Sequence, residues 1–394
     1  MHVSRGPFGF CCVARFGISF VPTASLAEVA FLHTPLCDLA AIRVPILLAG
    51  MANGPSNPEL VAAVIRAGGL GVFGASGMTC EALDREISRA RDLAGDGPIG
   101  VNAQLAPPTP ATGERARILE VLKPFRRELG LPDEPPARGP ADPPAALIET
   151  ALRAGVRVIT TFDDPAPIAE MTLAAGAQFY AMVTTADEAR RAVEVGAVCV
   201  IAQGSEAGGH RGTFGIGTSG GPSEPARVGT MALVPQVVDA VGDSVPVVAS
   251  GGIMDGRGIA AALALGAQGA SLGTVFLAAT EAGISPTHRD AIARTSGEHS
   301  VVTDLVTGRH ARWIRNRLID ALVEANPGHL GWGTQAGLVA DIRRAASEQG
   351  RVDLLPMLAG QGSALSGRPR PAAEIVAQLV RETEEALASL GARL

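Results

Sequence analysis

One glycine-rich stretch of this 394-residue chain carries the clearest candidate for proton chemistry. The stretch runs from Gln203 to Gly212 and contains four glycines and one histidine, His210. Glycines allow a backbone to turn sharply or to approach a ligand closely, because they lack a Cβ atom. Imidazole suits proton transfer or charge stabilisation near neutral pH. We therefore predict that His210 is catalytic, against the plainer alternative of a structural or merely exposed histidine.

The sequence does not assign a single role to either of the two charged residues in the same stretch, Glu206 and Arg211. Glu206 fits a catalytic base and equally a carboxylate that stabilises the loop. Arg211 receives no functional assignment, since a surface salt bridge would explain it as well.

Two further glycine segments indicate a phosphate site. Gly251 and Gly252 follow a short apolar run and precede an expected helix, and Gly273-Thr274 stands in the next unit along the chain. Bare backbone amides and the partial positive charge of helix N-termini both favour an anion. In barrel folds this site commonly lies after the seventh and eighth strands, which is where these segments fall. The plain alternative is a pair of tight turns.

Two positions at the ends of other expected strands suit a flat ligand. Gly50-Met51 ends the first strand, where small residues and a methionine fit against a ring face or simply pack in a turn. Asn102 lies in the third strand, where its amide would hydrogen-bond a ring carbonyl or cap the strand.

Eight short apolar runs alternate with amphipathic stretches, and this alternation defines the expected fold. Continuous hydrophobicity is typical of parallel strands buried on both faces. Several of the intervening helical stretches end in glycine, as a left-handed helix cap favours. The pattern predicts an α/β protein, a (β/α)8 TIM barrel. The expected strands are Pro45–Met51, Gly69–Ser76, Ile99–Leu105, Val156–Phe162, Gln178–Val183, Ala197–Gln203, Val245–Ser250 and Gly269–Leu277.

Two stretches interrupt the alternation. Pro107–Pro144 is rich in proline, includes the helical piece Glu114–Leu129, and forms either a flap over the site or a surface excursion. A second stretch, from about Gly283 to Gly360, contains the helical pieces Arg309–Glu324 and Thr334–Glu348. We expect four parts: an N-terminal extension outside the fold (1–32), the barrel (33–282), a small inserted helical subdomain (283–362) and a closing helix of the barrel (363–394), whose helical core is Ala372–Leu390.

Composition excludes several classes of function. The net charge is −6 with no basic run, which argues against nucleic acid as a partner. No apolar run is long enough to cross a bilayer, so no membrane association is expected. The five cysteines show neither metal spacing nor an even disulfide framework, so we expect no metal site and a cytoplasmic protein.

These segments together resemble the nitronate monooxygenases, formerly called 2-nitropropane dioxygenases. The resemblance runs from about residue 34 to residue 362. The Gln203–Gly212 motif is specific to this superfamily, whereas the glycine pairs are not. The matching segments are Thr34–Cys37, Pro45–Met51, Gly100–Asn102, Gln203–Gly212, Leu233–Val237, Ala249–Ile253, Leu272–Thr274, Thr307–Arg309 and Gly360–Gly362.

The resemblance implies FMN at the mouth of the barrel and His210 as the active-site histidine. It implies oxidation of an alkyl nitronate by O2 to a carbonyl compound and nitrite, with a small-molecule substrate and O2 as partners and without a nicotinamide. His210 would steady the nitro oxygens of the substrate, or in its neutral form remove the α-proton of a nitroalkane. The residues similar to the family's flavin contacts are Gly50, Met51, Asn102, Gln203, Gly208, Gly252, Gly273, Thr274 and Gln361.

Some positions depart from the family pattern. Ala49 stands where the family often has proline, and Ser271 where it often has glutamine. Some members shape the substrate pocket with tyrosines, whereas Tyr180, the only tyrosine here, lies in an expected strand.

Three competing functions remain. An FMN-dependent, NAD(P)H-using enoyl-acyl-carrier-protein reductase shares the fold and the Glu206–His210 motif. An IMP dehydrogenase-like barrel needs a loop cysteine, but Cys199 lies inside an expected strand. A non-catalytic barrel that binds a phosphorylated metabolite would keep the glycine pairs and would not need His210.

Overall fold

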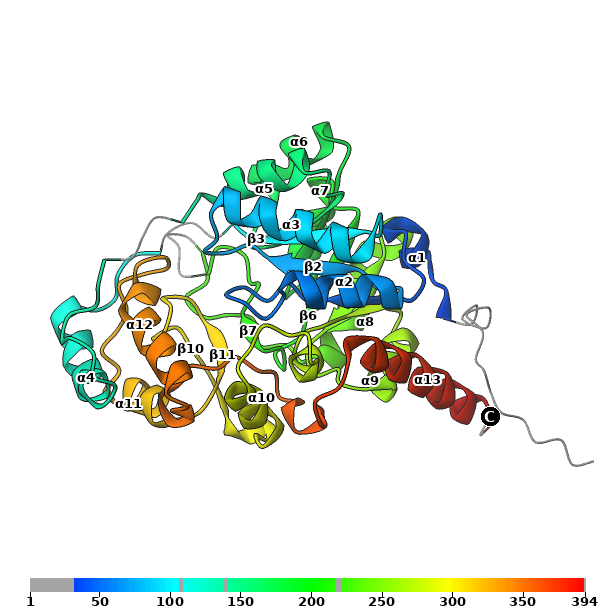
Figure 1. The fold of residues 1–394 in the computed structure, drawn as a ribbon. Coiled ribbons are helices and arrows are strands. Elements are labelled where there is room, and N and C mark those ends of the chain that lie inside the picture. The colour runs from blue at the N-terminus through cyan, green and yellow to red at the C-terminus, as the bar shows by residue number, and fades with distance from the viewer. Residues whose placement is uncertain (1–31, 106–108, 138–140, 217–220, 393–394) are drawn as a thin grey trace, which may run out of the picture.

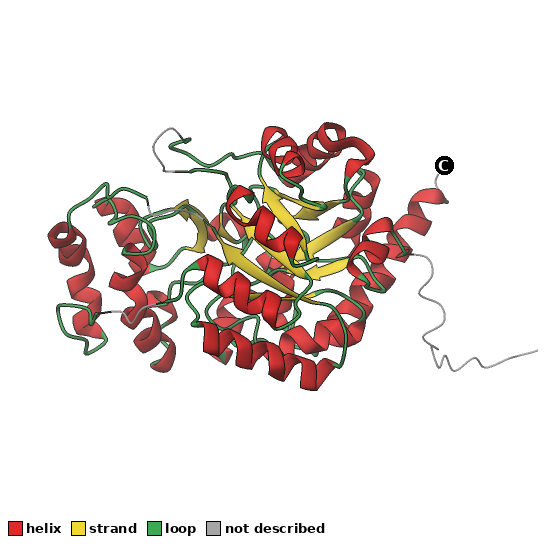
Figure 2. Cartoon of the chain, turned by 90° about the horizontal axis from the view of Figure 1, so that it is seen from above, coloured by secondary structure: helices red, strands yellow, loops and turns green. Residues whose placement is uncertain are grey.

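The computed structural model describes residues 32–105, 109–137, 141–216 and 221–392, and the expected extension 1–32 lies outside these residues except for Leu32. Eight parallel strands form a nearly closed barrel surrounded by helices, as Figures 1 and 2 show. A parallel bridge between Leu47 and Leu70 brings the first and second strands together. The barrel prediction is confirmed. Around the barrel the strands are β1 (Ile46–Leu48), β9 (Gly269–Leu272), β8 (Val247–Ser250), β6 (Cys199–Gln203), β5 (Gln178–Val183), β4 (Val158–Phe162), β3 (Ile99–Gln104) and β2 (Gly71–Gly74).

The barrel strands bury both of their faces. Alternate side chains pack either against the surrounding helices or against one another inside the barrel, in two separate apolar clusters. Tyr180 belongs to the inner cluster, together with Cys199 and Ile201, and its hydroxyl donates to Oε1 of Gln178 over 2.9 Å. Tyr180 therefore fills the barrel and does not line the cavity at its mouth.

Local capping signals place the helices around the barrel. The Asn57 side chain accepts a hydrogen bond from the N–H of Leu60 at the start of α2, and Gly68 ends that helix with a left-handed φ of +102°. Thr185 and Glu188 form a reciprocal capping box on α7. These helices are α1 (Pro35–Ala40), α2 (Pro58–Ala67), α3 (Cys80–Ala94), α5 (Pro144–Arg153), α6 (Ala166–Ala174), α7 (Ala186–Glu194), α8 (Thr230–Val241), α9 (Gly256–Ala264) and α13 (Ala372–Gly391), which packs on α9 and α2.

A second hydrophobic core lies beyond the barrel mouth. It unites α10 (Pro286–Ala293), α11 (Arg317–Ala325) and α12 (Gln335–Glu348) with α4 (Arg115–Glu128), which comes from the proline-rich stretch. Figure 1 shows α4, α11 and α12 grouped at one end of the molecule. A buried ion pair joins α4 to α12, with Arg126 Nη2 lying 2.7 Å from Asp341 Oδ2. We propose that 283–362 forms the inserted subdomain and that α4 completes its core.

A small antiparallel sheet connects this second core to the barrel. It consists of β10 (Ser300–Thr303), β11 (Ala311–Ile314) and β7 (Gly209–His210), and His210 pairs with Ala311. The expectation of a helix over Arg309–Glu324 is therefore wrong for its first part, because β11 pairs there with two other strands. None of the described helices is long and apolar enough to span a membrane.

Candidate active site

A cavity of about 750 Å³ opens where the barrel strands end, between the barrel and the second core. Segments that follow β1, β3, β6, β8 and β9 form its wall on the barrel side, and Trp332 and residues of α12 form part of the other side. Parallel strands end on the same side of a barrel, so residues far apart in sequence meet there. The wall includes the predicted residues Gly50, Met51, Asn102, Gln203, Gly208, His210, Gly251, Gly252, Gly273 and Thr274.

Gln361 is the predicted contact that does not line this cavity. Its residue is exposed, while its backbone N–H donates to the carbonyl of Glu206 over 2.9 Å. The neighbouring Gly360 does line the cavity, and its N–H donates to Thr274 Oγ1 over 2.9 Å. The backbone of residues 360 and 361 therefore connects the Gln203–Gly212 stretch with the loop of Gly273 and Thr274.

Three glycines that follow β8 and β9 line the cavity and have unpaired backbone N–H groups. Within the described parts of the chain, no group accepts a hydrogen bond from the N–H of Gly251, Gly252 or Gly273. Gly251 and Gly252 have φ angles of +112° and +72°, a conformation that side-chain-bearing residues rarely adopt. The two loops follow the seventh and eighth barrel strands, as the sequence predicts.

Among the glycines predicted to contact the cofactor, Gly273 alone tolerates a Cβ atom in both its space and its backbone conformation. Its φ is −111°, and a Cβ atom built there would lie 3.5 Å from Ala49 Cβ and 3.7 Å from Met51 Sδ, which are ordinary contacts. By contrast, a Cβ on Gly50 would come within 2.5 Å of Asn102 Cβ. Packing therefore explains Gly50, whereas the space beside Gly273 is open to a ligand.

His210 lies among aromatic side chains at the cavity wall. Phe162 stacks on it at 6.3 Å between ring centroids with 8° between the planes, and Trp332 meets it edge-on at 5.0 Å. Trp313 makes a second edge contact at 6.4 Å. Burial, assisted by the positive charge of Arg309, lowers the pKa of His210 to about 3. The imidazole is therefore neutral at physiological pH.

The partners of Thr307 define the tautomer of this imidazole. Thr307 Oγ1 lies 3.0 Å from His210 Nε2, and the same hydroxyl donates to the carbonyl of Arg309 over 3.1 Å. A hydroxyl has one proton to donate, so it accepts from Nε2–H of His210. Nδ1 then carries the lone pair, and no described residue hydrogen-bonds to it. The site thus holds a neutral imidazole able to accept a proton at Nδ1.

The loop that carries His210 is held by polar contacts on both sides. The side chain of Gln203 donates to the carbonyl of His210 and accepts from the N–H of Gly212, each over 2.9 Å. Arg309 pairs with Asp163 over 2.8 Å and donates to the carbonyl of Arg211. Both ends of the Gln203 amide are therefore used to position the loop.

The contacts of Glu206 and Arg211, the two charged residues of this loop, show which of their alternative roles the structure supports. Glu206 accepts hydrogen bonds from the backbone N–H and the hydroxyl of Thr230, at 2.8 and 2.9 Å to Oε2, so it stabilises the loop. Arg211 is buried and donates to the carbonyls of Gly204 and Gln203. Burial lowers the pKa of Arg211 to about 10, and the side chain stays charged at neutral pH.

Sequence reasoning missed the aromatic and basic parts of the wall. Trp313 and Trp332 are the two tryptophans of the chain, and both contact His210 although more than 100 residues separate them from it. Their rarity was the one available signal. His288 and Arg343 also line the cavity, and burial, with the charges of Arg343 and Arg289, lowers the pKa of His288 to about 4.

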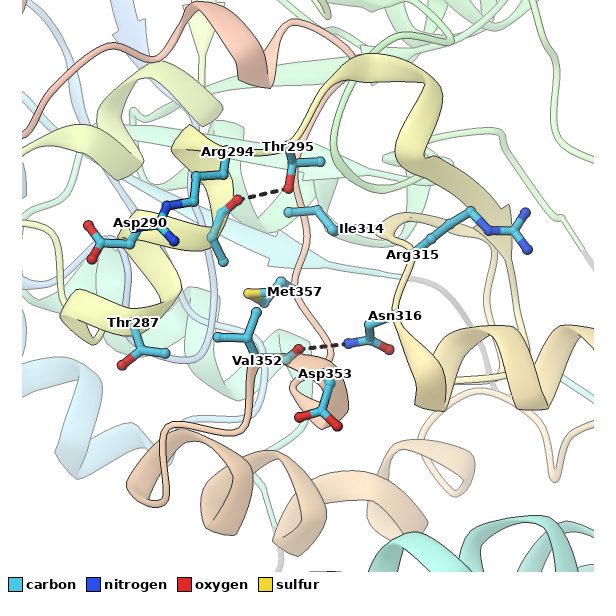
Figure 3. Close-up of a pocket in the computed structure, with 11 residues that line it drawn as sticks. Thr287, Asp290, Arg294, Thr295, Ile314, Arg315, Asn316, Val352, Asp353 and Met357 are labelled. Atoms are coloured by element: carbon cyan, nitrogen blue, oxygen red, sulfur yellow. Dashed lines mark hydrogen bonds between the residues drawn. The ribbon is translucent and has the colours of Figure 1, made fainter.

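A second cavity of about 580 Å³ lies within the second core, between α10, the end of β11 and the segment around Val352 (Figure 3). Two of its polar side chains have partners in the protein. Asn316 caps α11 and donates to the carbonyl of Val352, and Asp353 is paired with Arg317 and Arg351. The residues predicted to do chemistry are absent from its wall. Among the described residues, no cluster of histidine, cysteine, aspartate and glutamate could hold a metal ion.

Comparison with known proteins places this chain in a class. The family model described as nitronate monooxygenase matches residues 33–382. A probable nitronate monooxygenase of Staphylococcus aureus strain Newman is 35% identical over 354 residues, which cover 89% of this chain and 97% of the relative. One from Staphylococcus haemolyticus is 37% identical, covering 82% and 90%.

Two solved structures are similar to this chain over about nine tenths of its length. Nitroalkane oxidase from Streptomyces ansochromogenes superposes with a TM-score of 0.78 at 34% identity, covering 90% of this chain and 99% of that one. FabK from Thermotoga maritima gives 0.71 at 29% identity, covering 92% and 99%.

The fold and the site therefore define an oxidoreductase enzyme built on a (β/α)8 barrel. The chain belongs to the nitronate monooxygenase family, whose members are flavin-dependent in general.

Proposed function

We propose that the cavity binds FMN and that the enzyme oxidises nitronates and neutral nitroalkanes with O2, releasing a carbonyl compound and nitrite. One arrangement carries the proposal: Gly251, Gly252 and Gly273, whose backbone N–H groups are unpaired, line the same cavity as His210. A phosphate group fits such amides, because they supply donors that the protein does not otherwise use.

The residues present fit a flavin in further respects. The open space beside Gly273 admits a phosphate-bearing chain, and Met51 stands next to it. Gly50, Met51 and Asn102 line the wall on the barrel side. The chemistry that bound FMN supplies is electron transfer from the substrate to O2.

His210 supplies the proton chemistry. Its Nδ1 accepts the α-proton of a neutral nitroalkane, the C–H bond breaks, and the electron pair moves onto the nitro group to give the nitronate. The resulting imidazolium is stabilised by the adjacent anion and by the hydrogen bond from Nε2 to Thr307. Of the two roles that the sequence leaves to His210, the neutral imidazole is compatible with that of the base, whose basicity the negative charge of the nitronate formed beside it would raise.

The variant His210→Ala tests this assignment. We expect it to retain FMN while turnover of a neutral nitroalkane falls by roughly 10²–10⁴-fold, the usual effect of losing an acid–base group. A nitronate prepared beforehand needs no proton removal, so its turnover is expected to fall much less. Steady-state O2 consumption with both forms of one nitro compound measures the difference. Equal losses for the two forms would remove His210 from proton transfer.

The enoyl-reductase alternative predicts a different result. A solved structure of an enoyl reductase domain from Bacillus amyloliquefaciens gives a TM-score of 0.61 at 13% identity, which shows a shared fold alone. Such an activity requires rapid flavin reduction by NADH or NADPH.

The IMP dehydrogenase-like alternative is disfavoured because Cys199 lies in β6 and is 0% exposed.

A further inference from the structure

The end of β3 carries an amide group that the proposed function does not use. Gln104 is the last residue of β3, lines the cavity and is 5% exposed. Its Nε2 has no hydrogen-bond partner among the described residues. Leaving a buried donor unsatisfied costs about 1–3 kcal/mol, so such groups are uncommon unless a ligand completes them.

The other two strand-borne amides in the wall are already used by the protein. Asn102 Nδ2 donates to Thr160 Oγ1 over 2.9 Å, and both ends of the Gln203 amide hold the loop of His210. The sequence pointed to Asn102 as a donor toward a ring carbonyl. In the structure, the Nε2 donor of Gln104 has no partner among the described residues and is itself buried at the cavity wall, so it reaches a ligand by rotation of the terminal amide group.

The position of Gln104 places it near His210 and away from the phosphate loops. Gln104 pairs in register with Phe162, and Phe162 stacks on the imidazole of His210. Around the barrel, β3 lies four places from β8, on the opposite side from Gly251 and Gly252. The donor therefore belongs to the part of the cavity where the substrate would meet His210.

We propose that Gln104 is a substrate-binding residue whose Nε2 donates a hydrogen bond to an oxygen of the nitro or nitronate group. This contact holds the substrate so that its α-carbon faces Nδ1 of His210. The inference rests on the proposed function, and it extends that function by naming the group that recognises the two-oxygen end of the substrate.

The variants Gln104→Leu and Gln104→Glu test the proposal. One lost hydrogen bond corresponds to a rise of roughly tenfold in KM for a nitronate in the leucine variant. The glutamate variant adds a negative charge, so KM is expected to rise more for the anionic nitronate than for the neutral nitroalkane. Gln236→Leu, an exposed change on α8, is the matched control and is expected to leave both values unchanged.

Two equilibrium measurements separate substrate binding from flavin binding. Titration of the apoprotein with FMN is expected to give the same dissociation constant for wild type and both Gln104 variants. Calorimetric titration of the holoenzyme with nitrate, a planar anion with comparable oxygens, is expected to show weaker binding by Gln104→Leu.

The outcomes are distinguishable. A wild-type enzyme that oxidises neither nitronates nor nitroalkanes overturns the proposed function and this inference together. An active wild type with unchanged KM and nitrate affinity in Gln104→Leu overturns the inference alone. A loss of FMN affinity in Gln104→Leu would instead assign the amide to the flavin. If the leucine variant does not fold, Gln104→Met, which keeps the length of the side chain, replaces it in every arm.

Discussion

At His210, burial among Phe162, Trp313 and Trp332 favours a neutral imidazole, while the contact with Thr307 places its proton on Nε2. Because the folded-state pKa lies below the ordinary value, protonation requires a pH well below the usual range for histidine. The free enzyme therefore keeps Nδ1 available for proton transfer across the physiological range.

The pH dependence of kcat/KM tests this environment. With a neutral nitroalkane, kcat/KM is expected to show no loss attributable to His210 between about pH 8 and about pH 5, since the pKa of His210 is about 3. Stopped-flow reduction under anaerobic conditions measures the profile. An acid limb near pH 6.5 that disappears in His210→Ala would show that the imidazole is not shielded as described.

Gly273 allows a test of the phosphate site that does not disturb the fold. Gly273→Ala adds one methyl group in an ordinary backbone conformation with room around it, so the free energy of unfolding of the apoprotein should change little. FMN affinity is expected to fall at least tenfold, because the methyl group occupies the ligand's space. Fluorescence titration with FMN measures it. Gly337→Ala on α12, where a Cβ meets nothing within 4 Å, is the control.

At the scale of elements, the proline-rich stretch and the insertion meet above the barrel mouth. The N–H of Trp332 donates to Thr109 Oγ1 over 2.7 Å, and the N–H of Thr112 donates to the carbonyl of His329. Trp332 stands between Gly331 and Gly333, which have φ angles of +83° and +88°. This arrangement places the indole over His210 at the substrate end of the cavity.

Trp332→Ala is expected to enlarge the substrate end of the cavity. The ratio of kcat/KM for a long-chain nitroalkane to that for nitroethane should rise by about tenfold, because removing a large side chain relieves the clash with the longer chain. Trp313→Phe is the comparison variant, because Trp313 makes a more distant contact with His210. An unchanged ratio in Trp332→Ala would mean that this side chain does not limit substrate size.

The sequence predicts the elements of the barrel better than it predicts the insertion. Parallel strands buried on both faces leave a continuous apolar run, so all eight were recognisable, although the last ends at Leu272 and not at Leu277. The strands β11 and β7 are short and depend on pairing with each other across about 100 residues, which no local pattern records. The expected helix over Arg309–Glu324 was wrong in its first part for that reason, whereas α11 confirms its second part.

In the candidate site too, features with a local sequence pattern could be predicted and features that depend on distant contacts could not. Glycines with positive φ and the His210 loop carry local signals, so the sequence predicted that these segments meet at the barrel mouth, where they line one cavity. The unpaired donor of Gln104 could not be predicted, because no local sequence pattern records which buried polar groups lack a partner in the folded chain. The same holds for the tryptophans, which reach His210 through the second core.

At the scale of the whole molecule, one cavity lies between two hydrophobic cores. The barrel contributes the loops that we propose bind a phosphate and the loop of His210, and the insertion contributes α12 and Trp332 to the opposite wall. Figure 1 shows the second core lying to one side of the barrel. β11 connects the two cores by pairing with the strand that carries His210.

Anaerobic mixing of the FMN-loaded protein with a nitronate tests the central claim most directly. The flavin absorbance near 450 nm, roughly where oxidised flavins absorb, is expected to bleach rapidly and to return when O2 is admitted, with nitrite released. NADH in a parallel mixing experiment is expected to bleach it far more slowly. A protein that cannot be loaded with FMN, or a flavin that NADH bleaches quickly while the nitronate leaves it oxidised, would contradict the account.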